Sequence, residues 1–83
     1  MAVLKYPVAT EKTLSMVDRD NIIVYVVDME ANKKQVKEEF ENTFKVKVVN
    51  VNTVREPDNV KRAYVRLGKE FPASDIAKRL KLV

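Results

Sequence analysis

The feature that most constrains the fold is an apolar segment at residues 21–28, NIIVYVVD. In an extended strand, successive side chains point to opposite faces. The even-numbered residues from Ile22 to Val26 therefore lie on one face, and the odd-numbered residues from Ile23 to Val27 lie on the other. Because both faces are apolar, we expect a central strand that is covered on both sides.

A helix is predicted to begin after Asn32. This asparagine is a good N-cap residue, and Gln35 three positions later gives a pattern close to a capping box. Val36, Phe40 and Phe44 then recur at helical spacing. They form the apolar stripe of an amphipathic helix, which we expect to face the core.

The rest of the chain alternates between the two kinds of element. Strands are expected at residues 3–6, 46–55 and 61–67, with a short turn at 56–59 (EPDN). Helices are expected from Thr10, as N-cap, to Asp20, and over residues 72–80 with Ile76, Ala77 and Leu80 facing inward. This order predicts an α+β fold in one domain, residues 1–83: a split β-α-β, or ferredoxin-like plait, with a four-stranded, mainly antiparallel sheet and packed helices.

Composition argues against an enzyme. The 83 residues include neither cysteine nor histidine, so thiolate nucleophiles, the most common general base and the usual zinc ligands are missing. The single glycine, Gly68, follows the last predicted strand, which leaves no glycine-rich phosphate loop. We therefore expect no catalytic residues, no bound metal and no cofactor.

No segment suggests insertion into a membrane. The longest uncharged apolar run, Ile22–Val27, is too short to cross a bilayer. Near the N-terminus, Lys5 and Pro7 interrupt what would be the apolar core of a signal peptide. We therefore expect no membrane span and a cytoplasmic location.

The net charge of +4 is unevenly distributed, with six basic and two acidic residues between positions 45 and 67. In the strand at 61–67, alternate residues from Ala63 to Leu67 form an apolar face, and the opposite face carries Arg62, Tyr64 and Arg66. Guanidinium groups and a phenol ring suit the phosphates and bases of RNA, although solvated strands carry the same residues. Tyr64 has two interpretations, stacking on RNA or burial beneath the C-terminal helix.

Lysines also gather at the start of the helix that follows Asn32. Lys33, Lys34 and Lys37 lie where the helix dipole disfavours cations, and a bound phosphate could offset that cost. A solvated lysine cluster is the alternative. Asn50, Asn52 and Thr53 interrupt a valine-rich strand, where they could satisfy a sheet edge or hydrogen-bond to RNA.

Several segments together resemble one family, the large-subunit ribosomal protein L twenty-three. The opening PVATEK at 7–12 is similar to the family's P-x-x-T-E-K, and VNT at 51–53 matches its V-N-T. NKKQVK at 32–37 and FKVKV at 44–48 look like the family's helix and following strand, and KRAYVRL at 61–67 resembles its basic closing strand. Order and spacing agree over nearly the whole chain.

The resemblance implies a domain bound to large-subunit ribosomal RNA beside the exit of the nascent-peptide tunnel. It also implies ribosomal protein L twenty-nine as a neighbour and a share in the docking platform for the signal recognition particle and other exit-site factors. The turn at 56–60 is too short for the long hairpin of bacterial relatives, so the chain resembles the archaeal type and is not expected to line the tunnel. Carried over by position and combined with the charge pattern, the RNA-binding candidates are Thr10, Lys12, Lys33, Lys34, Lys37, Asn52, Thr53, Arg55, Lys61, Arg62 and Arg66.

Two other functions stay open from the residues themselves. The domain could be a free-standing RNA-binding α/β module that works outside the ribosome. It could also be a protein-interaction domain with no RNA role, using the acidic flank at 38–41 and an exposed sheet edge.

Overall fold

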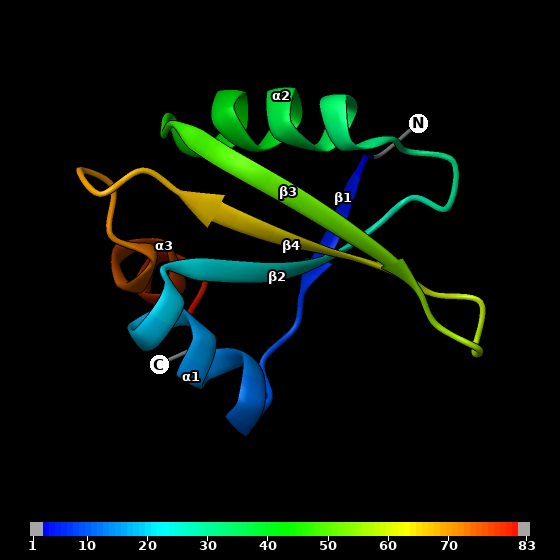
Figure 1. Ribbon diagram of the computed structural model, residues 1–83, viewed down its shortest axis with the longest axis horizontal. Helices are drawn as coiled ribbons and strands as arrows, with labels where there is room; N and C mark the ends of the chain where they lie inside the picture. Colours follow the sequence, from blue (N-terminus) through cyan, green and yellow to red (C-terminus); the bar gives the residue numbers. More distant parts are fainter. Residues whose placement is uncertain (1–2, 82–83) are drawn as a thin grey trace.

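The computed structural model describes residues 3–81, which form four strands and three helices (Figure 1). In chain order the elements are β1 (Leu4–Pro7), α1 (Glu11–Asp20), β2 (Ile22–Val27), α2 (Lys33–Phe44), β3 (Val48–Arg55), β4 (Lys61–Leu67) and α3 (Ala73–Arg79). Every predicted element is present in the predicted order.

The strands form one antiparallel sheet in the order β1-β2-β4-β3. Strand β4 lies between β2 and β3, and both pair with it in antiparallel fashion, so β2 and β3 run in the same direction. The segment β2-α2-β3 is therefore a β-α-β unit split by β4. The predicted α+β split β-α-β fold is confirmed.

Helix α2 lies along β3, whereas α1 and α3 pack against each other and against β2 (Figure 1). The side chains of Ile23 through Val27 are all buried, which confirms that β2 is a central strand covered on both faces. Because β3 and β1 are the outer strands, each leaves one edge that is not paired with another strand of residues 3–81. The β3 edge is the longer of the two.

The main core joins alternate residues of the sheet to all three helices. Ala63, Val65 and Leu67 are buried in the same cluster as Val36 and Phe40, as the strand and helix patterns predicted. Buried side chains of α1 and α3 belong to this cluster as well. The hairpin is thus held to the helices through a single apolar core.

Aromatic contacts fix α2 against β2. The Tyr25 ring meets Phe40 edge to face, with centroids 6.2 Å apart, and the Phe40 and Phe44 centroids are 4.6 Å apart. Such arrangements suit the quadrupoles of the rings. Burial raises the pKa of the Tyr25 phenol above its ordinary value of 10.0.

Both long helices begin with a reciprocal capping box. In α2, Asn32 accepts from the Gln35 backbone N–H at 2.8 Å, and Gln35 Oε1 accepts from the Asn32 N–H at 3.0 Å. In α1, Thr10 and Thr13 exchange equivalent bonds. The predicted N-caps are therefore confirmed at both helices.

The boundaries differ from the prediction at the N-terminus of β3 and at residue 21. Strand β3 begins at Val48 instead of residue 46. The reason is that Lys45, the C-cap residue after α2, adopts a left-handed conformation (φ 56°), and the chain must then turn back. Asn21 is the C-cap of α1, also left-handed (φ 57°), and not the first residue of the strand. Strand β1 covers Leu4–Pro7 instead of residues 3–6, and α3 covers Ala73–Arg79 instead of residues 72–80.

Candidate nucleic-acid interface

One face of the β3–β4 pair is polar and open to solvent. Register places Asn52 opposite Tyr64 and Asn50 opposite Arg66, so these side chains share the face that carries Arg62. Asn50, Asn52 and Arg66 are exposed, whereas Tyr64 is half-buried. Tyr64 is therefore neither fully buried beneath a helix nor fully exposed on this face.

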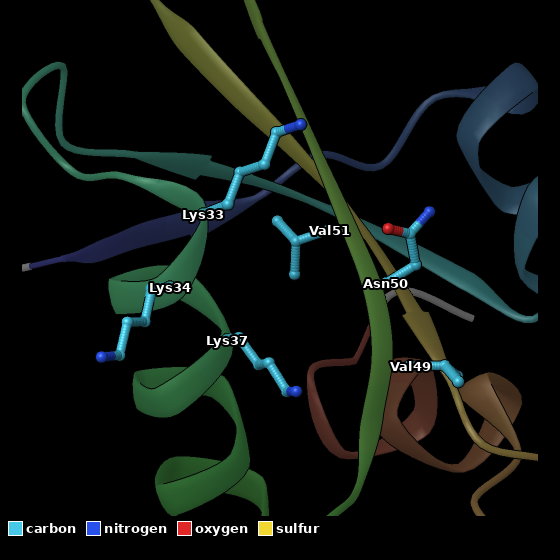
Figure 2. A pocket seen from close by; sticks show the side chains of 6 residues that line it. All are labelled: Lys33, Lys34, Lys37, Val49, Asn50 and Val51. Carbon is cyan, nitrogen blue, oxygen red and sulfur yellow. The ribbon is translucent and has the colours of Figure 1, made fainter.

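A second polar surface lies between α2 and β3, where a hollow of about 280 Å³ is lined by Lys33, Lys34, Lys37, Val49, Asn50 and Val51 (Figure 2). Lys33 and Lys37 reach from the helix toward the strand, whereas Lys34 points away from it. Val51 points toward the helix and forms an apolar floor, and Asn50 points to the other side of β3. The hollow therefore combines ammonium groups with an edge of the sheet.

A third surface lies at the C-terminal end of β4. There, a hollow of about 360 Å³ is lined by Lys47, Val49, Arg66, Leu67, Gly68, Lys69 and Glu70. The backbone N–H of Gly68 donates to the carbonyl oxygen of Lys47 at 3.0 Å, which brings the segment after β4 alongside the segment before β3. Three cations and one carboxylate thus meet at this hollow.

Four predicted RNA-binding residues have roles within the fold. Thr10 caps α1, and the half-buried Thr53 shares with Ala63 the face of the sheet that meets the core. The Lys61 ammonium donates to the carbonyl oxygen of Ala31 at 2.6 Å. These roles limit the contacts that Thr10, Thr53 and Lys61 can make with a ligand.

Arg62 is the fourth of these residues. Its Nη1 lies 3.8 Å from Glu56 Oε1, and its side chain retains 35% exposure. Its Nε is buried and has no hydrogen-bond partner among the described residues. The guanidinium is thus partly neutralised at the hairpin end of the sheet.

The other predicted residues are exposed but are not gathered in one place. Lys33, Lys34 and Lys37 share the α2 hollow, and Asn52 and Arg66 share the open sheet face. The remaining two stand apart, on α1 and at the end of β3 next to the hairpin turn: Lys12 and Arg55.

The list of RNA-binding candidates omitted Lys47, Lys69 and Asn50, although Asn50 was visible in the sequence as a polar interruption of the strand. Asn50 lies opposite Arg66 on the open face, and the two lysines line the hollow at the end of β4. The positive charge of Lys47 was visible in the basic stretch after position 45. Its proximity to Lys69 depends on the β3–β4 pairing, which composition does not reveal.

Within residues 3–81, no group of three or more acidic side chains is close enough to hold a metal ion. No helix in this part of the chain is both long and apolar enough to cross a bilayer.

A split β-α-β fold with basic hollows and an open polar sheet face defines a class: small α+β domains whose exposed surface suits a polyanion. The model of the family described as ribosomal protein L23 matches residues 2–71, and the chain belongs to that family. Because this family consists of ribosomal components and not of enzymes, the prediction of a non-enzymatic protein is confirmed.

Two relatives illustrate the similarity. The large ribosomal subunit protein uL23 of Trypanosoma brucei brucei is 36% identical over 81 residues, covering 98% of this chain and 49% of that protein. The large ribosomal subunit protein uL23c of Spinacia oleracea is 40% identical over 78 residues, covering 94% of this chain and 39% of its own length. The chain thus spans half or less of the length of these two relatives.

Proposed function

We propose that this chain is a structural constituent of the large ribosomal subunit that binds large-subunit ribosomal RNA. The observation that carries the proposal is the set of exposed cations in the α2 hollow and at the end of β4, in a member of a ribosomal protein family. The mechanism is electrostatic and positional. Lysine and arginine side chains neutralise phosphates and release counterions, while the sheet and α2 hold the cations in one register.

The proposed location is the ribosome in the cytoplasm, beside the exit of the polypeptide tunnel. The sequence motifs shared with the family support this location. They also support two further parts of the proposal: ribosomal protein L twenty-nine as a neighbour, and the signal recognition particle and other exit-site factors as ligands of the same platform. Strands β3 and β4 are joined by only the turn between Arg55 and Lys61, closed by a 2.7 Å bond from the Glu56 N–H to the Val60 carbonyl oxygen. A turn of this size supports a place at the rim of the tunnel and not along its wall.

Sedimentation of cell extracts tests the ribosomal role. The tagged chain, expressed at its native level, is expected to be recovered at one copy per large subunit and to remain bound in moderate salt. Recovery mainly in slowly sedimenting RNA complexes would contradict this role and favour a free-standing RNA-binding module.

Ribonuclease treatment tests the alternative that the chain is a protein-interaction domain with no RNA role. If the domain binds only proteins, its complexes should survive digestion of the RNA. The proposal instead predicts that digestion releases the chain from the subunit-sized fraction, because its cations contact phosphates and not an acidic protein surface.

A further inference from the structure

The two basic hollows meet at one residue. Val49 lines both the hollow beneath α2 and the hollow at the end of β4. The β3–β4 register shifts between Val48 and Asn50, so Val49 occupies a bulge, and this residue is 60% exposed. A bulge bends its strand and redirects side chains. The hollows therefore form one continuous surface that crosses β3 at Val49.

We call this surface the basic band. It consists of the α2 lysines, the crossing point on β3 and the cations at the end of β4: Lys33, Lys34, Lys37, Lys47, Val49, Asn50, Arg66 and Lys69. None of its six cations forms an ion pair with a described residue, and Glu70 is the one acidic residue that lines either hollow. The band therefore carries a strong positive potential.

The opposite end of the β3–β4 hairpin is electrostatically weaker. There Lys61 donates to the Ala31 carbonyl oxygen, and Arg62 lies beside Glu56. Asp58 adds a second carboxylate in the turn. Although the sequence pattern predicted RNA-binding residues at this end, Lys61 and Arg62 already have partners within the protein.

The band offers cations on both sides of its crossing point. Lys33 and Lys37 lie on the α2 side of Val49, and Lys47, Arg66 and Lys69 line the hollow at the end of β4. A nucleic-acid strand that crosses β3 at Val49 can therefore meet cations before and after the crossing.

We infer that the phosphate backbone of one ribosomal RNA strand lies along the basic band and crosses β3 at Val49, away from the hairpin turn. This inference rests on the proposed function and identifies which part of the surface performs it. Ammonium and guanidinium groups pair with the phosphates on both sides of the crossing, and the Asn50 amide is placed to hydrogen-bond to a sugar or base. Lys47 and Lys69 are RNA ligands in this arrangement.

Two substitutions on the same strand provide a matched test. Val49→Asp introduces a carboxylate at the crossing point, and Val54→Asp introduces the same group near the hairpin turn, where Val54 is 44% exposed. Binding of each purified, folded variant to large-subunit ribosomal RNA is measured by filter retention. Val49→Asp should weaken binding roughly tenfold, because it places a like charge beside phosphates, and Val54→Asp should change it by less than about threefold.

A pair of charge reversals tests the band without altering its crossing point. The combined Lys47→Glu and Lys69→Glu variant is compared with Lys5→Glu and Lys78→Glu, which changes the net charge equally at exposed sites on β1 and α3. The first variant should lose affinity and reduce the slope of log affinity against log salt by about 1.5, as expected for two lost phosphate contacts. The second should keep the wild-type slope.

The outcomes separate the inference from the proposed function. If the wild type binds the RNA but Val54→Asp weakens binding as much as Val49→Asp, or both double variants lose affinity equally, the basic band is wrong while RNA binding stands. If the wild type shows no salt-dependent binding at all, the proposed function is overturned together with the inference.

Discussion

The side chain of Lys61 is bound to the backbone of Ala31, with 2.6 Å between its Nζ and the carbonyl oxygen. Lys61 is the first residue of β4, and Ala31 is a fully buried residue in the connection from β2 to α2. The bond therefore holds the segment that precedes α2 to the hairpin end of β4, an inner strand of the sheet. A residue that the sequence pattern assigned to RNA has a structural role here.

Replacing Lys61 should lower stability. Lys61→Met keeps the aliphatic stem but leaves the Ala31 carbonyl oxygen without this donor, which is expected to cost about 1 to 3 kcal/mol in the free energy of unfolding. Urea denaturation followed by circular dichroism measures it. An unchanged midpoint in urea would show that water replaces the ammonium at no cost.

Glu41 should behave as a second structural residue. Its Oε2 accepts a hydrogen bond of 2.9 Å from the Val48 N–H, at the start of β3. Glu41→Ala removes the acceptor and should destabilise the protein by about 1 to 2 kcal/mol, whereas Glu41→Gln retains an acceptor and should cost less. Equal losses in thermal unfolding of the two variants would contradict the role of this bond.

Local patterns were sufficient to predict the fold. The apolar residues on both faces of β2, the N-caps at Thr10 and Asn32, and the stripe from Val36 to Phe44 depend on neighbouring residues only, and all are present in the structure. The start of β3 could not be placed, because it depends on Lys45 adopting a left-handed conformation and on Glu41 reaching back to Val48. Those contacts require the tertiary structure.

Asn21 shows the same limit more strongly. Its Nδ2 lies 3.0 Å from the Leu67 carbonyl oxygen, and its Oδ1 accepts from the Ala73 N–H at 2.6 Å, so one amide joins the end of α1 to β4 and α3. These partners lie 46 and 52 residues away in the chain. From the sequence alone, Asn21 is predicted only to be the polar first residue of a strand.

Asn21 should therefore be among the least tolerant polar positions. Asn21→Gly keeps the left-handed backbone at low cost but loses the side-chain hydrogen bonds, so it should destabilise the protein by about 2 kcal/mol. Asn21→Ala loses the same bonds and also disfavours the left-handed conformation, so it should cost about 3 to 4 kcal/mol. Chemical denaturation measures both losses. If alanine were tolerated as well as glycine, the left-handed conformation would not contribute to the cost.

Tyr25 should make the protein sensitive to alkaline pH. Burial raises the pKa of its phenol above 10.0, so the unfolded chain releases this proton at a lower pH than the folded protein does. The stabilising contribution is complete below about pH 10 and is lost as the pH rises through the raised folded-state pKa.

Two tyrosine variants separate the contribution of Tyr25 from other effects of alkaline pH on stability. Tyr25→Phe should flatten the fall in melting temperature between neutral and alkaline pH, whereas Tyr6→Phe, at a residue that is 54% exposed, should follow the wild type. Parallel curves for the wild type and Tyr25→Phe would show that the buried phenol does not titrate in this range.

The interface was predicted less completely than the fold. Charge density identified the α2 lysines and the outer face of β4, and the structure exposes Lys33, Lys37 and Arg66 as expected. Charge density alone could not reveal that the Lys61 ammonium donates to a carbonyl oxygen, or that Lys47 and Lys69 line the same hollow. Which cations are free to bind depends on partners that are distant in sequence.

The salt dependence of RNA binding tests the central claim most directly. Affinity of the wild-type chain for isolated large-subunit ribosomal RNA is measured over a range of potassium chloride concentrations. If roughly five phosphates are contacted, log affinity should fall linearly with log salt at a slope of about −4. A slope near zero would contradict a surface built to bind phosphates.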